Sequence, residues 1–109
     1  MQLLEGSYFT MILKTIPLFI LLLISFASSA ADVEAGKTKA ALCAACHGVE
    51  GISPSPLWPN LAGQKEAYLV KQIIAFQTGE RKDPSMAPMV AGLSKTDVEN
   101  IAAYYASLK

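Results

Sequence analysis

The chain has 109 residues and a formal net charge of zero, because nine lysines and arginines balance nine aspartates and glutamates. This length allows one domain of ordinary size. The balanced charge argues against a nucleic-acid partner, which normally requires a basic excess or patch. A hydrophobic fraction of 52% beside 17% charged residues argues against intrinsic disorder. The two cysteines are too few for a disulfide scaffold.

Residues 1–31 carry the pattern of a secretory signal peptide. Lys14 precedes the apolar run of residues 16–27, and small residues follow that run. A cation, a short apolar core and small residues at a cleavage point are the three parts of such a peptide. The apolar run is too short to span a bilayer, which takes about 20 residues. We therefore predict export, with cleavage at about Ala31 and Met11 as an alternative start. An uncleaved N-terminal anchor is the competing interpretation.

The remaining residues, 32–109, predict a small all-α domain. Apolar residues at helical spacing predict one helix over residues 65–77 and another that begins at Ser94. Ser94 is followed three residues later by Asp97, which resembles a capping box. A domain this short buries only a modest core, so a further source of stability is expected.

The first predicted helix runs from Val33 into a haem-attachment motif. Cys43-x-x-Cys46-His47 uses both cysteines and the only histidine. The two thiols add across the vinyl groups of haem, and the imidazole that follows can bind the iron. The alternatives are a redox-active C-x-x-C pair, which belongs with a βαβ unit, and half of a zinc site, which needs further ligands. Neither context is present in the sequence, so we predict one covalently bound haem c.

A second axial ligand must come from another residue type, because the sequence has no second histidine. The usual alternative is a methionine thioether. Two of the four methionines fall in the predicted signal peptide, which leaves Met86 and Met89. Both lie in a segment that contains Pro84 and Pro88, which predicts a stiff, non-helical loop. For at least one of these methionines, ordinary core filling is the correct interpretation.

Seven segments spread over the region after residue 31 match the pattern of one family. They are Glu34-Ala35-Gly36-Lys37, Cys43–Gly48, Trp58-Pro59-Asn60-Leu61-Ala62-Gly63-Gln64, Tyr68-Leu69-Val70-Lys71-Gln72, Gly79-Glu80-Arg81, Met86-Ala87-Pro88-Met89, and Leu93-Ser94 through Ala103-Tyr104-Tyr105. With these segments the chain resembles class I cytochromes c, in particular the small bacterial cytochromes related to one half of the dihaem cytochrome c-four type. The resemblance implies the small class I cytochrome c fold, with helices packed around a covalently bound haem.

The same resemblance assigns roles to individual residues. In relatives of this type the methionine ligand stands eight positions before the serine that begins the following helix, which implies Met86 and leaves Met89 as the alternative. The Pro59 carbonyl is expected to accept the Nδ1–H of His47 and so to fix the orientation of the ring. Trp58 is expected to line the haem pocket, with packing against a propionate as its alternative.

The resemblance also assigns roles to residues farther from the motif. Gly36 is expected to let the first helix approach the last one closely, with Tyr104 packed across it. Arg81 and Lys82 are expected either to pair with propionates or a partner protein, or to lie in a solvated loop.

The expected function is one-electron transfer, because two axial ligands leave the iron no vacancy for a substrate. We predict a soluble periplasmic monohaem carrier that exchanges electrons with respiratory or dehydrogenase partner proteins. It is expected to be a monomer with no stable membrane insertion after signal cleavage. The balanced charge favours docking through an apolar patch at the haem edge. The alternatives are a cytochrome subunit of a larger dehydrogenase or oxidase complex, and a five-coordinate haem sensor or peroxidase-like enzyme.

Overall fold

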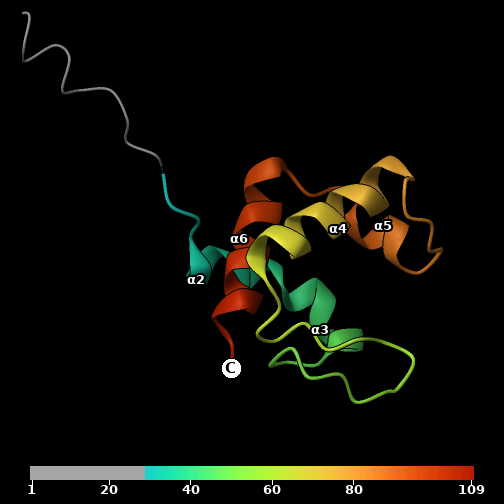
Figure 1. The fold of residues 1–109 in the computed structure, drawn as a ribbon, viewed down its shortest axis with the longest axis horizontal. Helices are drawn as coiled ribbons and strands as arrows, with labels where there is room; N and C mark the ends of the chain where they lie inside the picture. Colours follow the sequence, from blue (N-terminus) through green and yellow to red (C-terminus); the bar gives the residue numbers. More distant parts are fainter. Residues whose placement is uncertain (1–28) are drawn as a thin grey trace, which may run out of the picture. The chain divides into compact units, whose positions relative to one another are not determined.

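The computed structural model describes residues 29–109, so nearly all of the predicted signal peptide lies outside the described residues. Within residues 29–109 the chain is helical and forms no strand, which confirms the all-α prediction. The helices, labelled as in Figure 1, are α2 (Val33–Lys39), α3 (Ala41–His47), α4 (Glu66–Thr78), α5 (Met86–Val90) and α6 (Lys95–Ser107). In this part of the chain no helix combines the length and the apolar character needed to cross a membrane.

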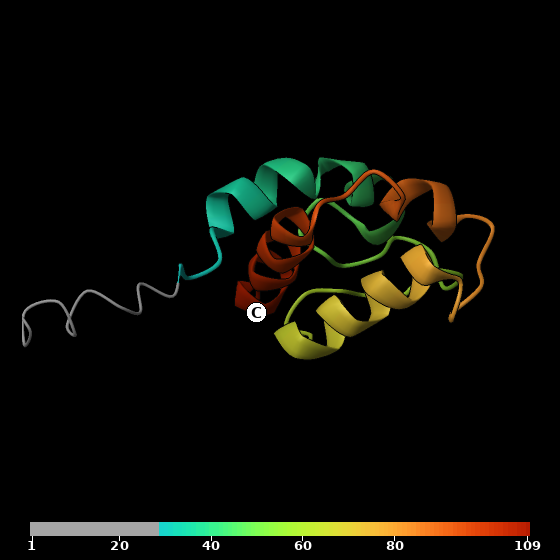
Figure 2. The ribbon, with the colours of Figure 1, turned by 90° about the horizontal axis from the view of Figure 1, so that it is seen from above.

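Helix α6 is at the centre of the fold. It packs against α2 and against α4, and Figure 2 shows it crossing between them. Its inward side is largely buried, and the buried residues are Val98, Asn100, Ile101, Ala102, Ala103, Tyr104 and Tyr105. The amide oxygen of Asn100 accepts a hydrogen bond of 2.8 Å from the backbone N–H of Asp32, so this buried polar group is paired. The last helix therefore supplies most of the core.

The contact between α2 and α6 is closest at Gly36. A Cβ atom added there would overlap the backbone carbonyl of Asn100 and would lie 3.0 Å from the Cβ of Tyr104. Only a residue without a side chain allows this approach. The predicted packing of Tyr104 across Gly36 is confirmed.

The boundaries of α4 and α6 follow from local signals in the sequence. Helix α4 ends at Gly79, whose φ of 78° is in the left-handed region. At the start of α6 the Ser94 hydroxyl accepts a hydrogen bond from Asp97 N–H, and the Asp97 carboxylate accepts one from Ser94 N–H, both at 3.0 Å. This is a complete capping box, as predicted. Lys39, at the end of α2, pairs with the Asp97 carboxylate at 3.5 Å.

The structure corrects the prediction of a non-helical loop around the methionines. Residues Met86–Val90 form the short helix α5. Pro88 is its third residue, and N–H groups in the first turn of a helix have no partner within the helix, so proline loses nothing there. Asp83 precedes the helix, and its side chain accepts hydrogen bonds from Ser85 N–H (2.8 Å) and Met86 N–H (3.1 Å). The first predicted helix also differs, because the chain bends at the buried Ala40 and divides into α2 and α3.

Candidate haem site

Helix α3 carries the C-x-x-C-H motif, and His47 is its last residue. The imidazole is buried, with 6% of the residue exposed. Its Nδ1 lies 2.8 Å from the carbonyl oxygen of Pro59. A carbonyl can only accept a hydrogen bond, so Nδ1 donates its N–H, and Nε2 is the ring nitrogen that remains for a metal. An imidazole oriented in this way is the usual form of a metal ligand.

The segment between α3 and α4 holds the Pro59 carbonyl in place. Next to Pro59, the Asn60 side-chain oxygen accepts a 2.7 Å hydrogen bond from Ser53 N–H. The Ser53 hydroxyl donates to the backbone oxygen of Cys46 at 3.2 Å. The segment is thus tied both to itself and to α3. Sequence analysis missed Ser53 and Asn60, because hydrogen bonds within an irregular loop leave no periodic signal; an asparagine within a proline-rich turn was the available hint.

The two cysteines are half-buried and are not joined in a disulfide. Burial raises the pKa of the Cys43 thiol above its ordinary value, and a hydrogen bond with Tyr105 opposes that rise in part. Burial also raises the pKa of Tyr105. A redox-active C-x-x-C pair depends on a lowered thiol pKa, so the environment of Cys43 argues against that alternative. Residues 29–109 also contain no cluster of three or more histidine, cysteine or acidic side chains that could hold a zinc ion.

The residues near the motif fit a haem group. Two thiols and an imidazole on one helix match its two vinyl groups and its iron. Large apolar side chains are also exposed on the elements that follow the motif, as expected of a chain that leaves apolar surface for a ligand. They are Ile52, Leu57 and Trp58 in the loop, Tyr68 and Ile74 on α4, and Met89 on α5.

Helix α5 carries both candidate methionines and packs against α4 (Figure 1). Met86 is its first residue and is half-buried, whereas Met89 is 41% exposed. Residues three apart share one face of a helix, so both side chains leave α5 on the same side. The choice between them therefore stays a prediction.

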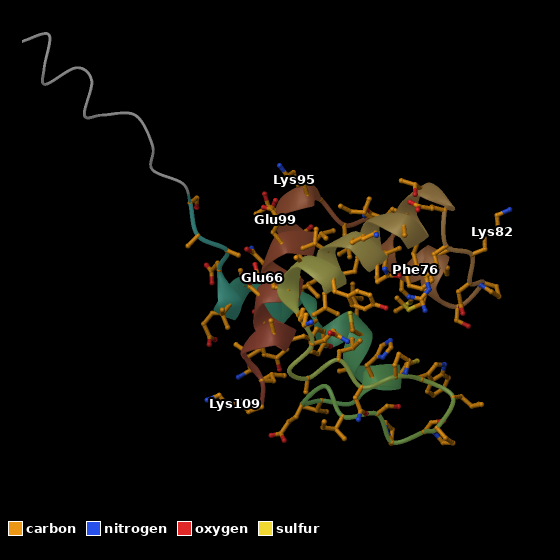
Figure 3. The ribbon with its side chains drawn as sticks, viewed as in Figure 1. Glu66, Phe76, Lys82, Lys95, Glu99 and Lys109 are labelled. Carbon is orange, nitrogen blue, oxygen red and sulfur yellow. The ribbon has the colours of Figure 1, made fainter. Side chains whose placement is uncertain are left out.

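Trp58, Arg81 and Lys82 have different environments. Trp58 is 39% exposed in the loop beside Pro59, and its role in the pocket stays a prediction. Arg81 folds back onto α4, where its Nη1 donates to the Gln72 side chain at 2.8 Å and its guanidinium carbon lies 4.6 Å from the centre of the Phe76 ring. Arg81 is thus held against the protein, whereas Lys82 extends away from it (Figure 3).

A helical fold built around a haem-attachment motif defines a c-type cytochrome domain. The cytochrome c family matches residues 33–109, and the chain belongs to this family. With its C-x-x-C-H motif it carries one covalently bound haem c.

Relatives of known identity resemble this chain over most of its described length. Cytochrome c4 from Pseudomonas aeruginosa is 47% identical over 87 residues, which are 80% of this chain and 43% of that protein. The crystal structure of reduced recombinant cytochrome c4 from Pseudomonas stutzeri superposes with a TM-score of 0.70 at 47% identity, over 73% of this chain and 47% of that one. This likeness confirms the class I cytochrome c fold. The chain spans less than half the length of these two relatives.

Two further relatives are similar to this chain. Cytochrome c-554(548) from Halomonas halodenitrificans is 46% identical over 81 residues, which are 72% of this chain and 98% of that protein. A thiosulfate dehydrogenase electron acceptor from Thiomonas intermedia is 39% identical over 85 residues, which are 77% of this chain and 39% of that protein.

Proposed function

We propose that this cytochrome is a monohaem electron carrier with histidine and methionine as axial ligands. The observation that carries the proposal is the buried His47, whose Nδ1 faces the Pro59 carbonyl at 2.8 Å directly after the two motif cysteines. A relative that this chain matches over 98% of its length, cytochrome c-554(548), supports a carrier made of a single domain of this kind.

Each residue of the site has a separate task. Cys43 and Cys46 would hold the porphyrin to α3 through thioether bonds. His47 would bind the iron through Nε2, and the hydrogen bond of its Nδ1 with the Pro59 carbonyl fixes the orientation of the imidazole. Met86 would be the second residue that binds the iron, through its thioether sulfur. The bound haem supplies one-electron cycling between Fe(III) and Fe(II).

With His47 and Met86 both on the iron, and with apolar side chains against the ring, the haem would be limited to electron transfer. A closed site excludes substrates and external ligands. The loop of residues 48–63 and helix α5 lie on different parts of the chain. Both must therefore stay folded around the site if external ligands are to be kept from the iron.

An absorption spectrum of the purified holoprotein, oxidised and reduced, with and without carbon monoxide, tests this function. We expect the sharp bands of a low-spin haem c in the reduced protein and no change on adding carbon monoxide at neutral pH. Rapid binding of carbon monoxide would instead establish an open iron, as in a sensor or a peroxidase-like enzyme.

We also propose that the carrier works in the periplasm, after removal of residues 1–31. The proposal depends on the signal-peptide pattern around Lys14 and on the need to attach haem to cysteines. N-terminal sequencing of the coloured protein from a periplasmic extract is the test. A mature end near Asp32 is the expected result, and an intact N-terminus in the membrane fraction would show the anchor interpretation to be correct.

A second candidate function is that of an acceptor domain for a thiosulfate-oxidising dehydrogenase. It is favoured by the 39% identity to a thiosulfate dehydrogenase electron acceptor. Thiosulfate oxidation to tetrathionate releases two electrons per tetrathionate, so two molecules of a one-haem acceptor would be reduced. Stopped-flow mixing of the oxidised holoprotein with such a dehydrogenase and thiosulfate tests this candidate. Size-exclusion chromatography then shows whether the two proteins separate, as a free carrier would, or stay together.

A further inference from the structure

One side chain of α4 reaches across to the end of the methionine helix. Gln77 is the penultimate residue of α4, and its Nε2 donates hydrogen bonds to the carbonyl oxygens of Val90 at 2.8 Å and Leu93 at 3.0 Å. Val90 is the last residue of α5, and Leu93 lies in the turn that leads to α6. Both protons of the Gln77 side-chain amide are therefore used in hydrogen bonds at the C-terminal end of α5.

Helix α5 needs such external support because it has only five residues. So short a helix is not stable by itself, and its last carbonyls have no partner within the helix. Its entrance is held by Asp83, whose backbone oxygen accepts the N–H of Ala87 at 3.0 Å and whose carboxylate accepts the N–H of Met86. Its end is held by Gln77 and by the Leu93 backbone N–H, which donates to the Val90 carbonyl oxygen at 3.2 Å.

We propose that Gln77 is a positioning residue that holds α5, and with it the methionine thioether, in place against the iron. This inference rests on the histidine–methionine ligation proposed above. Gln77 is exposed on the surface of α4, whereas the carbonyl that it binds belongs to Val90, which is 3% exposed. Its hydrogen bonds therefore join the end of α4 to the end of α5 and to the segment that leads to α6.

The structure suggests a variant that removes this support without disturbing the core. In Gln77→Leu both hydrogen bonds are lost with little change in side-chain size. In Gln77→Glu a carboxylate replaces the donor and faces two carbonyl oxygens. Gln64→Glu is the matched control, because its carboxylate still accepts the hydrogen bond that Gln64 Oε1 accepts from Lys65 N–H, and it adds the same charge before the opposite end of α4.

Cyanide binding to the ferric holoprotein measures how often the methionine leaves the iron, since cyanide can bind only when it has left. Loss of two hydrogen bonds corresponds to about a tenfold change in that equilibrium. We therefore expect cyanide affinity to rise about tenfold in Gln77→Leu and further in Gln77→Glu, with the near-infrared band of methionine ligation weakened. The control should match the wild type. The free energy of unfolding should fall in the two Gln77 variants by no more than the roughly 1.4 kcal/mol to which this tenfold change corresponds, and the control should keep the wild-type value.

Two results would overturn the inference. If the wild type shows the near-infrared band and both Gln77 variants bind cyanide as the wild type does, the methionine is held without Gln77. If the wild type lacks that band and binds cyanide readily, methionine ligation itself is wrong, and the role of Gln77 is rejected with it.

Discussion

The close approach of the first and last helices depends on the absence of one side chain. Because a Cβ at Gly36 would overlap the backbone of Asn100, Gly36→Ala should force α2 away from α6. We expect a loss of about 1–3 kcal/mol in the free energy of unfolding, as for other overpacked sites. Chemical denaturation of the holoprotein measures this loss.

Gly92→Ala is the matched control for this substitution. A Cβ at Gly92 would meet no atom within 4 Å. The change should leave the stability unaltered or raise it by up to about 1 kcal/mol, because alanine restricts the unfolded chain. Equal losses in the two variants would contradict the packing argument, since only one of the two sites is crowded.

The ligand methionine can be identified by a pair of single substitutions. Met86→Ala should abolish the near-infrared band of the ferric holoprotein, because it removes the proposed axial sulfur. Met89→Ala should keep the band, since this residue is 41% exposed and makes the smaller contribution to the protein interior. Absorption spectra of both ferric variants decide the question, and the reverse pattern would assign the ligand to Met89.

Among individual residues, the sequence predicts the roles of those whose chemistry is distinctive. Two cysteines and a histidine in fixed order predict the haem, and a small residue at position 36 is consistent with close helix packing. The role of Asn60 was not predicted, because it depends on the hydrogen bond that the Asn60 side-chain oxygen accepts from Ser53 N–H. Only the folded loop brings these two groups together. Arg81 likewise could not be placed on α4, because the path of its loop is set by the bond from its N–H to the Ala75 carbonyl (3.0 Å).

Among the helices, α6 begins at a capping box in which both hydrogen bonds between Ser94 and Asp97 are formed. Ser94→Ala removes the hydroxyl that accepts the Asp97 N–H, so that one donor of the first turn loses its partner. Substitutions of this kind typically cost about 1 kcal/mol. We expect a fall of this size in the free energy of unfolding of the holoprotein, measured by denaturant titration. Since α6 forms the core, a Ser94→Ala variant as stable as the wild type would mean that the cap frays in solution.

The same cap makes stability depend on pH. Hydrogen bonds from Ser94, above all from its backbone N–H, together with the charge of Lys39, hold the pKa of Asp97 below its ordinary value of 3.8. The carboxylate therefore stabilises the fold fully above about pH 4, and this contribution is lost as the pH falls through the lower folded-state pKa. Asp97→Asn should be less stable than the wild type at neutral pH and should approach it in acid. Denaturant titrations at pH 7 and pH 3 measure the difference, and a constant difference between the two proteins would contradict this account.

Elements were predictable where a local signal marks their ends. The apolar spacing and Gly79 place α4 within one residue at each end, and Ser94 marks the start of α6. Helix α5 escaped prediction because Pro84 and Pro88 read as helix breakers, although a proline in the first turn of a helix is harmless. The division of α2 from α3 at Ala40 depends on packing against the core, which sequence periodicity does not report.

For the molecule as a whole, the haem was predictable from the C-x-x-C-H motif, and the helical fold from apolar residues at helical spacing. A C-x-x-C-H motif requires a ring, and a short chain around a ring can bury it with a few helices. The arrangement of those helices was implied by the family resemblance rather than by the residues. The pairing of α6 with both α2 and α4 depends on contacts distant in the sequence, such as that between Gly36 and Asn100.

The stability of the whole domain should depend on its bound haem. Within residues 29–109 the main core cluster is small, and two of its six residues are alanines: Ala40, Leu69, Ile101, Ala102, Tyr104 and Tyr105. Several large apolar side chains of the described residues are left exposed by the polypeptide itself. A chain of this length has little other apolar area to offset the entropy of folding. A Cys43→Ala, Cys46→Ala double variant, freed of haem, should therefore lose most of the helical circular-dichroism signal of the holoprotein. If the haem-free variant kept that signal and a cooperative thermal transition, the polypeptide core alone would suffice, and the haem would serve electron transfer without supporting the fold.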